Sequence, residues 1–393
     1  MDIVKKIANK HLKGDPIVWA IVFCLMAFSV LVVYSASGNL AYRNAGGNTE
    51  YYLIKHSILL ALSFCVMWIA HKIDFRYYPI IAKVGLLLSV PLLLFTWFYG
   101  PEINEASRWM IIPIVEQRFQ PSDLAKLALI SSLAGMLSKR QHEIENCTIK
   151  DLLPMLAWMV VICGLIGLSD LSTSGLLFTT GLLIMFIGRV PLKRLGVIIV
   201  AGLMVGALAI VIGQRGPTFV SRIKTHLDPT ALSFQSEQSY IAVAKGGLLG
   251  EGPGNSKQKN FLPHPYSDFV YAIIIEEYGI GGGLFMLILY LGLLYRGMLV
   301  ASKSDRPLGG LLSAGLSFSL VLQALINMGV VVGLMPVTGL TLPFVSMGGT
   351  SLLFTGVALG IILSVSRGES SAKVQEPVIR PKGNVRRKMT VEA

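Results

Sequence analysis

The chain has 393 residues, of which 53% are hydrophobic and 14% are charged, and its formal net charge is +12. Soluble domains carry about 25% charged residues, so this composition excludes an ordinary water-soluble protein. The positive charge lies mostly in loops and in the tail, where attraction to anionic lipid explains it, so it does not indicate a nucleic-acid partner. No P-loop or dinucleotide-binding glycine motif occurs. Three of the four cysteines lie in apolar stretches, which argues against a disulfide framework.

Ten apolar stretches are each long enough to cross a bilayer as a helix, which takes about 20 residues. They are too long and too uniformly apolar for the strands of a β-barrel. The sequence therefore predicts an all-α polytopic membrane protein with ten transmembrane helices. The predicted helices are 17–37, 53–70, 80–99, 121–138, 152–169, 173–190, 194–213, 269–295, 309–332 and 343–366.

Lysine and arginine are concentrated in the N-terminal segment, in alternate loops and in the C-terminal segment. Cytoplasmic segments carry this excess, so both termini are expected in the cytoplasm. The first apolar stretch lacks a small-residue cleavage site and is expected to be retained as a helix. Residues 1–366 are predicted to form one ten-helix membrane domain, and residues 367–393 a basic cytoplasmic tail that is expected to be disordered.

Two loops on the outer face are long, at about residues 100–120 and 214–268, the second lying between the seventh and eighth helices. Long loops in compact domains are usually functional, so the chemistry is expected on the outer face. In the second loop the pattern predicts a short interfacial helix followed by a turn-rich segment.

Asp268 stands immediately before the eighth apolar stretch, in the segment LPHPYSDFVYAIIIEEYG. One interpretation is a helix N-cap, which aspartate suits well. The other is a general base at the border between water and membrane. Partial desolvation there would raise its pKa and suit it to abstract a proton.

Four residues in and beside the first long loop are candidates for binding an anionic group. Charges at membrane depth are costly and therefore indicate function. Asp123 and Lys126 are three residues apart and are predicted to pair, either as a local ion pair or as part of an anion site. Arg108 suits phosphate, and Trp109 suits a membrane interface. Asp170, at the turn between the fifth and sixth helices, is interpreted as a solvated structural acid.

Glu276 and Glu277 lie inside the eighth apolar stretch. Adjacent helical residues point about 100° apart, so the two carboxylates are predicted not to share a partner. They form either a structural polar clamp across the bundle, reaching Lys126, Gln323 or Asn327, or a path for protons or ions.

Gly348 and Gly349 lie in PFVSMGGTS, residues 343–351, which is predicted to open the last helix. Small residues at such a place allow close helix packing. The alternative is a small-residue floor beneath a lipid-linked substrate.

Several of these segments together resemble the SEDS family (shape, elongation, division and sporulation). FQPSDLAK resembles the family's FQPSE-x-x-K element, and Arg108-Trp109 resembles the element before it. The resemblance covers about residues 17–366, and GEGPGNSKQK is similar to the cell-division branch rather than the elongation branch. Two departures are QPSD for QPSE and Ser172 for a glycine in SDLST. The other matching segments, in the family's order, are RIKTHLDP, EQSYIAVAKGGLLGEGPGNS, LPHPYSDFVYAIIIEEYG and PFVSMGGTS.

The resemblance implies a peptidoglycan glycosyltransferase that polymerises lipid II into β-1,4-linked glycan strands on the outer face of the cytoplasmic (inner) membrane. Its expected place is the division septum, and its expected partners are a class B penicillin-binding protein and other division proteins. In the family, the acid matching Asp268 is essential, and the residues matching Trp109, Asp123 and Lys126 are implicated.

The mechanism expected from this resemblance is a single displacement. Asp268 takes the proton of the 4-hydroxyl of lipid II as that oxygen attacks an undecaprenyl-pyrophosphate-linked glycan. Lys126 and Arg108 are candidates to stabilise the leaving pyrophosphate. A divalent cation, Mg²⁺ or Mn²⁺, could assist, although the sequence contains no metal-ligand cluster.

Three alternatives remain open. An elongation polymerase of the same family would share the chemistry. A lipid II flippase or ion-coupled transporter would use Glu276, Glu277 and Lys126 as a path, and predicts inverted repeats with broken helices. A division scaffold without chemistry would tolerate replacement of Asp268 by asparagine.

Overall fold

A helix coincides with each of the ten predicted stretches. The structure is a computed structural model that describes residues 12–38, 40, 42, 48–103, 106–112, 117–141, 143–144, 147–212, 216–228 and 232–375. The ten helices are α2 (Pro16–Ala36), α4 (Thr49–Lys72), α5 (Tyr78–Tyr99), α6 (Pro121–Lys139), α7 (Ile149–Ser169), α8 (Leu171–Ile187), α9 (Leu192–Ile212), α12 (Val270–Lys303), α13 (Pro307–Val331) and α14 (Ser351–Gln375).

In the described part of the chain, eight helices are long and apolar enough to cross a membrane. The two helices outside this set are α6 and α8. Helix α8 has 17 residues. Helix α6 packs against α5, α13 and α8, and small or polar residues such as Ser131 and Ser132 occupy its buried surface. Because neighbouring helices rather than lipid surround α6, its sequence need not be strongly apolar. The protein is therefore a helical membrane protein with several spans.

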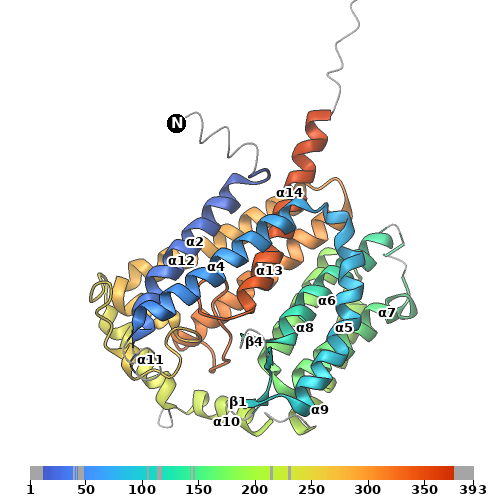
Figure 1. Ribbon diagram of the computed structural model, residues 1–393. Coiled ribbons are helices and arrows are strands. Elements are labelled where there is room, and N and C mark those ends of the chain that lie inside the picture. Colours follow the sequence, from blue (N-terminus) through green and yellow to red (C-terminus); the bar gives the residue numbers. More distant parts are fainter. Residues whose placement is uncertain are drawn as a thin grey trace, which may run out of the picture.

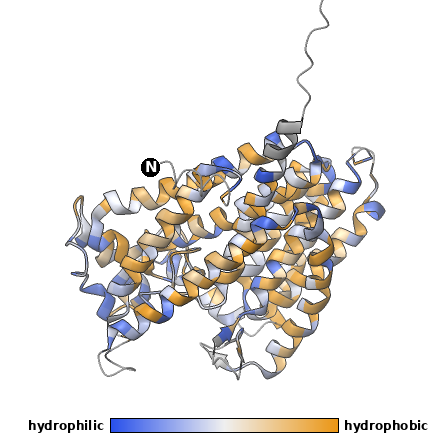
Figure 2. Ribbon diagram, turned by 45° about the horizontal axis from the view of Figure 1, so that its top comes forward, coloured by the Kyte–Doolittle hydropathy of each residue, from blue (hydrophilic) through white to orange (hydrophobic). Residues whose placement is uncertain are grey.

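The helices form two groups (Figure 1). Helices α2, α4, α12, α13 and α14 lie in one group, and α5 to α9 lie in the other. The groups are joined where α13 packs against α6 and α8. Figure 2 shows hydrophobic residues along the helices and hydrophilic residues mainly near their ends, as expected for helices that face lipid. The start of α2 and the end of α14 lie at the same end of the molecule in Figure 1.

Helix α12 is broken at Gly279, whereas the sequence predicts a continuous helix over 269–295. Gly279 has φ 67° and ψ −171°. A Cβ atom at Gly279 would lie 2.3 Å from the carbonyl oxygen of Leu248, so only glycine fits. The main chain of Ile280 donates to the carbonyl of Gly247 at 2.9 Å. A returning loop therefore inserts at the break, and the long straight part of α12 begins beyond it.

The last helix begins at Ser351, so the prediction that residues 343–351 open it is wrong. Residues 332–350 form an irregular connection after α13, and Phe344 and Gly349 have positive φ there. The close packing assigned to Gly348 and Gly349 lies elsewhere. A Cβ atom at Gly356 would come within 2.6 Å of the Ser63 carbonyl oxygen, and one at Gly360 within 2.5 Å of the Met67 carbonyl oxygen. These two glycines, four residues apart, let α14 approach α4 closely.

The two long segments predicted as outer loops contain secondary structure. The first holds two short hairpins, β1 (Glu102–Ile103) with β2 (Ala106–Ser107) and β3 (Met110–Ile112) with β4 (Gln117–Phe119). The second holds α10 (Gly216–Leu227), α11 (Phe234–Gly246) and the 3₁₀ turn η2 (Gln258–Asn260), so it contains two helices before its turns rather than one.

The boundary of the predicted tail also differs. Helix α14 continues to Gln375, so the first residues of the predicted tail are helical. Residues 376–393 lie outside the described part of the chain.

Candidate functional site

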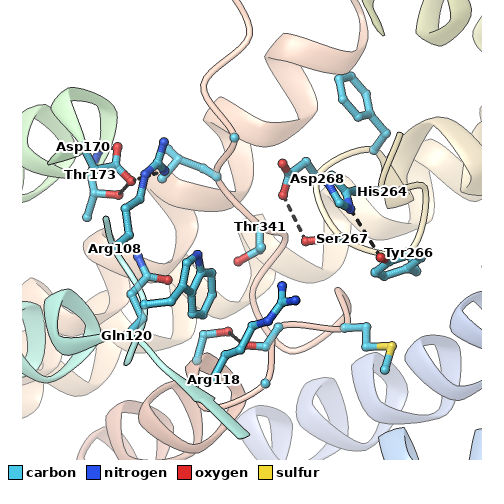
Figure 3. A pocket seen from close by; sticks show the side chains of 18 of the residues that line it. Arg108, Arg118, Gln120, Asp170, Thr173, His264, Tyr266, Ser267, Asp268 and Thr341 are labelled. Atoms are coloured by element: carbon cyan, nitrogen blue, oxygen red, sulfur yellow. Dashed lines mark hydrogen bonds and ion pairs between the residues drawn. The ribbon is translucent and has the colours of Figure 1, made fainter. Parts of the chain in front are cut away.

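A cavity of about 730 Å³ lies where the two helix groups meet. Its walls include residues of α4, α6, α8, α10 and α13, of the segment 108–120, and of the connections before α12 and before α14. The cavity brings together residues that are distant in sequence (Figure 3). Six predicted site residues line it, namely Arg108, Trp109, Asp123, Lys126, Asp170 and Asp268.

Asp268 projects into the cavity and does not cap a helix. The N-cap of α12 is Phe269, and no side chain makes a capping hydrogen bond there, so the N-cap interpretation is wrong. The Asp268 carboxylate accepts a hydrogen bond from Ser267 Oγ at 3.0 Å. Among the described residues no cation forms a salt bridge with it.

The surroundings of Asp268 raise its pKa. Part of the residue stays open to the cavity, but protein atoms surround the carboxyl group and burial penalises its charged form. The hydrogen bond from Ser267 and the positive charges of His264, Arg108 and Arg222 act in the opposite direction and are weaker. A carboxylate of this kind is more basic than a solvated one, which suits it to accept a proton.

The main chain around Asp268 is fixed by Asn327 of α13 and by the connection that follows this helix. Asn327 Nδ2 donates to the carbonyl oxygens of Asp268 and Leu340, each at 2.7 Å. Ser346 Oγ donates to the carbonyl of Ser267 at 2.7 Å. Residues 340–347 therefore hold the acid in place. Asn327, considered from the sequence as a partner for the glutamates, acts on Asp268 instead.

The predicted pairing of Asp123 with Lys126 is confirmed. Lys126 Nζ lies 2.8 Å from Asp123 Oδ1 and 3.4 Å from Gln323 Oε1 on α13. Asp123 Oδ2 is buried without a hydrogen-bond partner in the described structure. The ion pair lies within α6, the hydrogen bond from Lys126 to Gln323 crosses the junction between the helix groups, and Asp123 Oδ2 remains an unused acceptor.

Arg108 forms a second ion pair, with Asp170. The distance from Arg108 Nη1 to Asp170 Oδ2 is 2.7 Å. Asp170 is also the N-cap of α8, because it accepts hydrogen bonds from the main chain of Thr173 at 3.1 Å and from Thr173 Oγ1 at 2.9 Å. The interpretation of Asp170 as a solvated acid is therefore wrong: capping and pairing bury it.

Besides Arg222, two cations in the cavity, Arg118 and Lys55, were not singled out from the sequence. Arg118 lies on β4 and points toward the middle of the cavity in Figure 3. Lys55 reaches it from α4. Neither has an ion pair or side-chain hydrogen bond with another described residue, in contrast to Arg108 and Lys126. The only sequence signal was a basic residue directly before FQPSD, in a loop already expected to be functional.

Glu276 and Glu277 lie outside the cavity and hold the loop that precedes η2. Glu276 accepts hydrogen bonds from Ser256 Oγ and from the main chain of Lys257 at 3.0 Å and Gln258 at 3.2 Å. Glu277 accepts from Ser35 Oγ of α2 and from the main chain of Ser256 at 3.4 Å.

The prediction that the two glutamates share no partner is wrong. Ser256 offers its hydroxyl group to Glu276 and its main-chain N–H to Glu277, in two directions. These contacts favour the clamp over the ion path, and they replace the proposed contacts with Lys126, Gln323 or Asn327.

The described residues contain no group of three His, Cys, Asp or Glu side chains that could hold a metal ion. Of the cavity carboxylates, Asp123 and Asp170 already pair with cations. The divalent cation considered from the sequence therefore has no protein-built ligand set in this part of the chain.

Fold and site together define a polytopic helical membrane protein with an acid and several cations in a cavity at the helix ends. The model of the FTSW_RODA_SPOVE family, described as cell cycle protein, matches residues 15–371. The chain belongs to this family, which confirms the resemblance drawn from its motifs.

Individual relatives agree with this assignment. The chain is 34% identical to the probable peptidoglycan glycosyltransferase FtsW of Alkalilimnicola ehrlichii, over 93% of this chain and 92% of that relative. It is similar to a chain of a peptidoglycan synthase complex that coordinates polymerization and crosslinking, with TM-score 0.69, 28% identity and coverage of 91% and 98%. It is also similar to the rod shape determining protein RodA of Thermus thermophilus, with TM-score 0.65, 26% identity and coverage of 91% and 97%.

Proposed function

We infer that this protein is a peptidoglycan glycosyltransferase of the inner membrane that polymerises lipid II into glycan strands during septal wall synthesis. The relative from Alkalilimnicola ehrlichii is named a probable peptidoglycan glycosyltransferase, and 92% of its length aligns with this chain. The observation that carries the inference is the position of Asp268. It is a carboxylate with a raised pKa and no ion pair among the described residues, and it faces a cavity rich in cations.

Asp268 is the proposed general base. It accepts the proton of the 4-hydroxyl group of the acceptor sugar as that oxygen bonds to the anomeric carbon of the lipid-linked donor. The bond from that carbon to pyrophosphate breaks, and the single displacement converts an α-linkage into a β-1,4 linkage. Pyrophosphate leaves with its own electron pair, so no second acid is needed, unlike in the hydrolysis of glycosides.

The leaving pyrophosphate is proposed to meet Arg118 first. Arg118 and Lys55 have donors free for a ligand, whereas Asp170 and Asp123 already compensate Arg108 and Lys126. A guanidinium group matches two phosphate oxygens at once. Because Arg108 and Lys126 are already paired with carboxylates, we propose that they support the cavity walls and do not stabilise the pyrophosphate directly. Trp109 offers a flat apolar surface in the same cavity.

The full topology is part of the proposal. We place all ten helices across the membrane, with both termini in the cytoplasm and the hairpins, α10 and α11 on the outer face. Residues 1–366 form the membrane domain, and residues 367–393 form a basic cytoplasmic tail whose first part continues α14 to Gln375. The two chain ends of the described helices α2 and α14 lie on one face in Figure 1, and the hairpins and α10 lie on the opposite one, which supports this arrangement.

A class B penicillin-binding protein is the proposed partner. The support is the similarity to a chain of a complex in which polymerization and crosslinking are coordinated. Lipid II and an undecaprenyl-pyrophosphate-linked glycan are the proposed substrates.

The test uses purified protein, alone and with its transpeptidase partner, and labelled lipid II. Wild type is expected to form glycan polymer on a gel, and folded Asp268→Asn none. The matched control is Asp305→Asn, an exposed aspartate that follows α12, which should polymerise as wild type does. Equal polymer from wild type and Asp268→Asn would remove the base assignment. No polymer from wild type with its partner would overturn the function itself.

A further inference from the structure

A second cavity, of about 410 Å³, adjoins the first one. It lies between α10 and α11 and is closed by residues of the connections before α12 and α14. Arg222, Gln235, Pro263 and Val337 line both cavities, so the two share a wall. A chain-like substrate that leaves the first cavity past these residues would enter the second.

Hydroxyl groups, an amide and aromatic rings predominate among the polar and flat side chains around this second cavity, together with Arg222 and His226. Neutral hydrogen-bonding groups come from Ser221, Thr225, Ser233, Gln235, Ser236 and Tyr240, and none of the described residues that line the cavity is a carboxylate. The Gln235 amide and the Tyr240 hydroxyl make no hydrogen bond with other described residues, so both can serve a ligand. The Tyr240 ring is held against Gly333, where an added Cβ atom would lie 3.1 Å from it.

Phe234 adds an apolar surface that the fold itself does not bury. Its side chain remains 56% exposed although it stands at the start of α11 and lines the cavity. A pyranose ring has one face of C–H bonds and a rim of hydroxyl groups. Such a ring packs its face on an aromatic ring and its hydroxyl groups on amides and hydroxyls. The volume is within the roughly 300–1,000 Å³ typical of ligand pockets.

We propose that this second cavity is a saccharide-binding subsite that holds a sugar of the glycan strand beyond the pair of sugars reacting at Asp268. The proposal rests on the polymerase function inferred above. A strand longer than the first cavity has to leave it, and the shared wall leads to a surface suited to neutral sugars. The stem peptide of lipid II fits less well, because it carries carboxylates. Among the described lining residues, Arg222 already donates to the Val337 carbonyl at 2.9 Å, and His226 is the one other side chain that can carry a positive charge.

The first test compares Phe234→Ser with Phe261→Ser. Phe261 is equally exposed, at 57%, lies in the same long segment, and lines neither cavity. With labelled lipid II, Phe234→Ser should shorten the glycan strands by roughly threefold to tenfold, because one aromatic contact is lost from each elongating complex. Phe261→Ser should give the wild-type length distribution. Equal lengths for both variants and wild type would overturn the subsite while leaving the polymerase function intact.

Lipid II without its stem peptide separates the two ligand classes. The shortening in Phe234→Ser should persist with this substrate. If it disappears, the cavity binds the peptide, and the sugar assignment is wrong.

A binding experiment tests the subsite without requiring polymerisation. The full chain carrying Asp268→Asn, which is expected to be inactive, is titrated with the β-1,4-linked tetramer of N-acetylglucosamine, and binding is followed by saturation-transfer NMR. Adding Phe234→Ser should weaken binding about fivefold, and adding Phe261→Ser should not change it. Equal binding by all three proteins, or no binding by any, would overturn the subsite whatever the outcome of the polymerisation assay.

Discussion

Asp268 combines two demands that conflict in one residue, because a base must be ionised while the cavity around it favours the neutral form. Burial raises its pKa above the ordinary 3.8. A raised pKa in the folded protein means that the protonated form is favoured there, so ionisation lowers the free energy of unfolding as pH rises through that pKa. The protein accepts this loss of stability at its active group, as is common at functional sites.

The pH dependence of polymerisation should reflect this shift. Only ionised Asp268 accepts a proton, so kcat/KM should rise with pH and level off above an apparent pKa that exceeds that of a solvated aspartate. The measurement is the initial rate between about pH 3.5 and 8, with thermal stability followed over the same range. Asp268→Asn should be at least as stable as wild type at neutral pH. A rate that is flat down to the ordinary pKa of aspartate, with intact protein, would contradict the assignment.

Asn327 is predicted to be a positioning residue for Asp268. Its amide bridges the carbonyls of Asp268 and Leu340, and it is 2% exposed. In Asn327→Leu both carbonyls lose their donor, and a small displacement of the base can lower kcat roughly 100-fold with little change in KM. The matched control is Ser317→Ala on the same helix, because Ser317 Oγ is buried without a partner in the described structure. A fall in stability without a fall in kcat would reduce Asn327 to a structural role.

Residue pairs close in sequence could be predicted, and distant ones could not. The spacing of Asp123 and Lys126 places them on one face of a helix, and the ion pair is observed. Arg108 and Asp170 are 62 residues apart in the sequence, and no local sequence pattern predicts their contact. Arg118 and Lys55 were missed for the same reason, since their role depends on which neighbouring cations have already found carboxylates.

At the scale of elements, hydrophobic pattern located every long helix but misplaced their interruptions. The break in α12 depends on Gly279 meeting the carbonyl of Leu248, a contact between segments that no periodicity reveals. The sequence pattern predicts a start of α14 that is too early, because PFV in 343–351 is apolar. Tertiary hydrogen bonds hold that segment as an irregular connection, for example from Tyr290 Oη to the Pro343 carbonyl at 2.5 Å.

The loop at this break depends on Glu276 more than on Glu277. Both Glu276 oxygens accept hydrogen bonds, whereas Glu277 Oε2 is buried without a partner in the described structure. Glu276→Gln replaces an acceptor that faces main-chain N–H groups, so it should lower the free energy of unfolding by about 1.5–3 kcal/mol. Glu277→Gln can keep both of its accepted hydrogen bonds and should cost less.

The measurement that compares these two variants is thermal unfolding in detergent, together with polymerisation of lipid II. A destabilised Glu276→Gln that still polymerises below its unfolding temperature supports a structural clamp. Loss of polymerisation at full stability in either variant would instead revive a role for these carboxylates in the chemistry.

For the whole molecule, the sequence could predict a helical membrane protein but not its cavity. Apolar stretches indicate where the helices lie, polar residues mark the helix ends, and the order of the motifs is read directly from the sequence. The cavity exists because two helix groups meet at α13, α6 and α8, and its residues come from both groups. Its second chamber between α10 and α11 depends on a segment for which the sequence indicated one helix and the structure contains two.

The proposed topology predicts that this cavity opens on the outer side of the membrane. The part of α12 beyond Gly279, up to Lys303, has a length of about 36 Å at 1.5 Å per residue, enough to cross the roughly 30 Å hydrocarbon core. Leu249, which is 92% exposed, lies by the break at one end, and the exposed Asp305 follows the other end. The two positions should therefore lie on opposite sides of the membrane.

Single cysteines at these positions, in a background lacking Cys24, Cys65, Cys147 and Cys163, report on each side. A maleimide that cannot cross the inner membrane, added to cells with a permeabilised outer layer, should label Leu249→Cys and spare Asp305→Cys. Lysing the cells should expose both, which controls for reactivity. The reverse pattern would place the Asp268 cavity on the cytoplasmic side, where a polymerase of exported lipid II could not work. That result would contradict both the proposed topology and the proposed reaction.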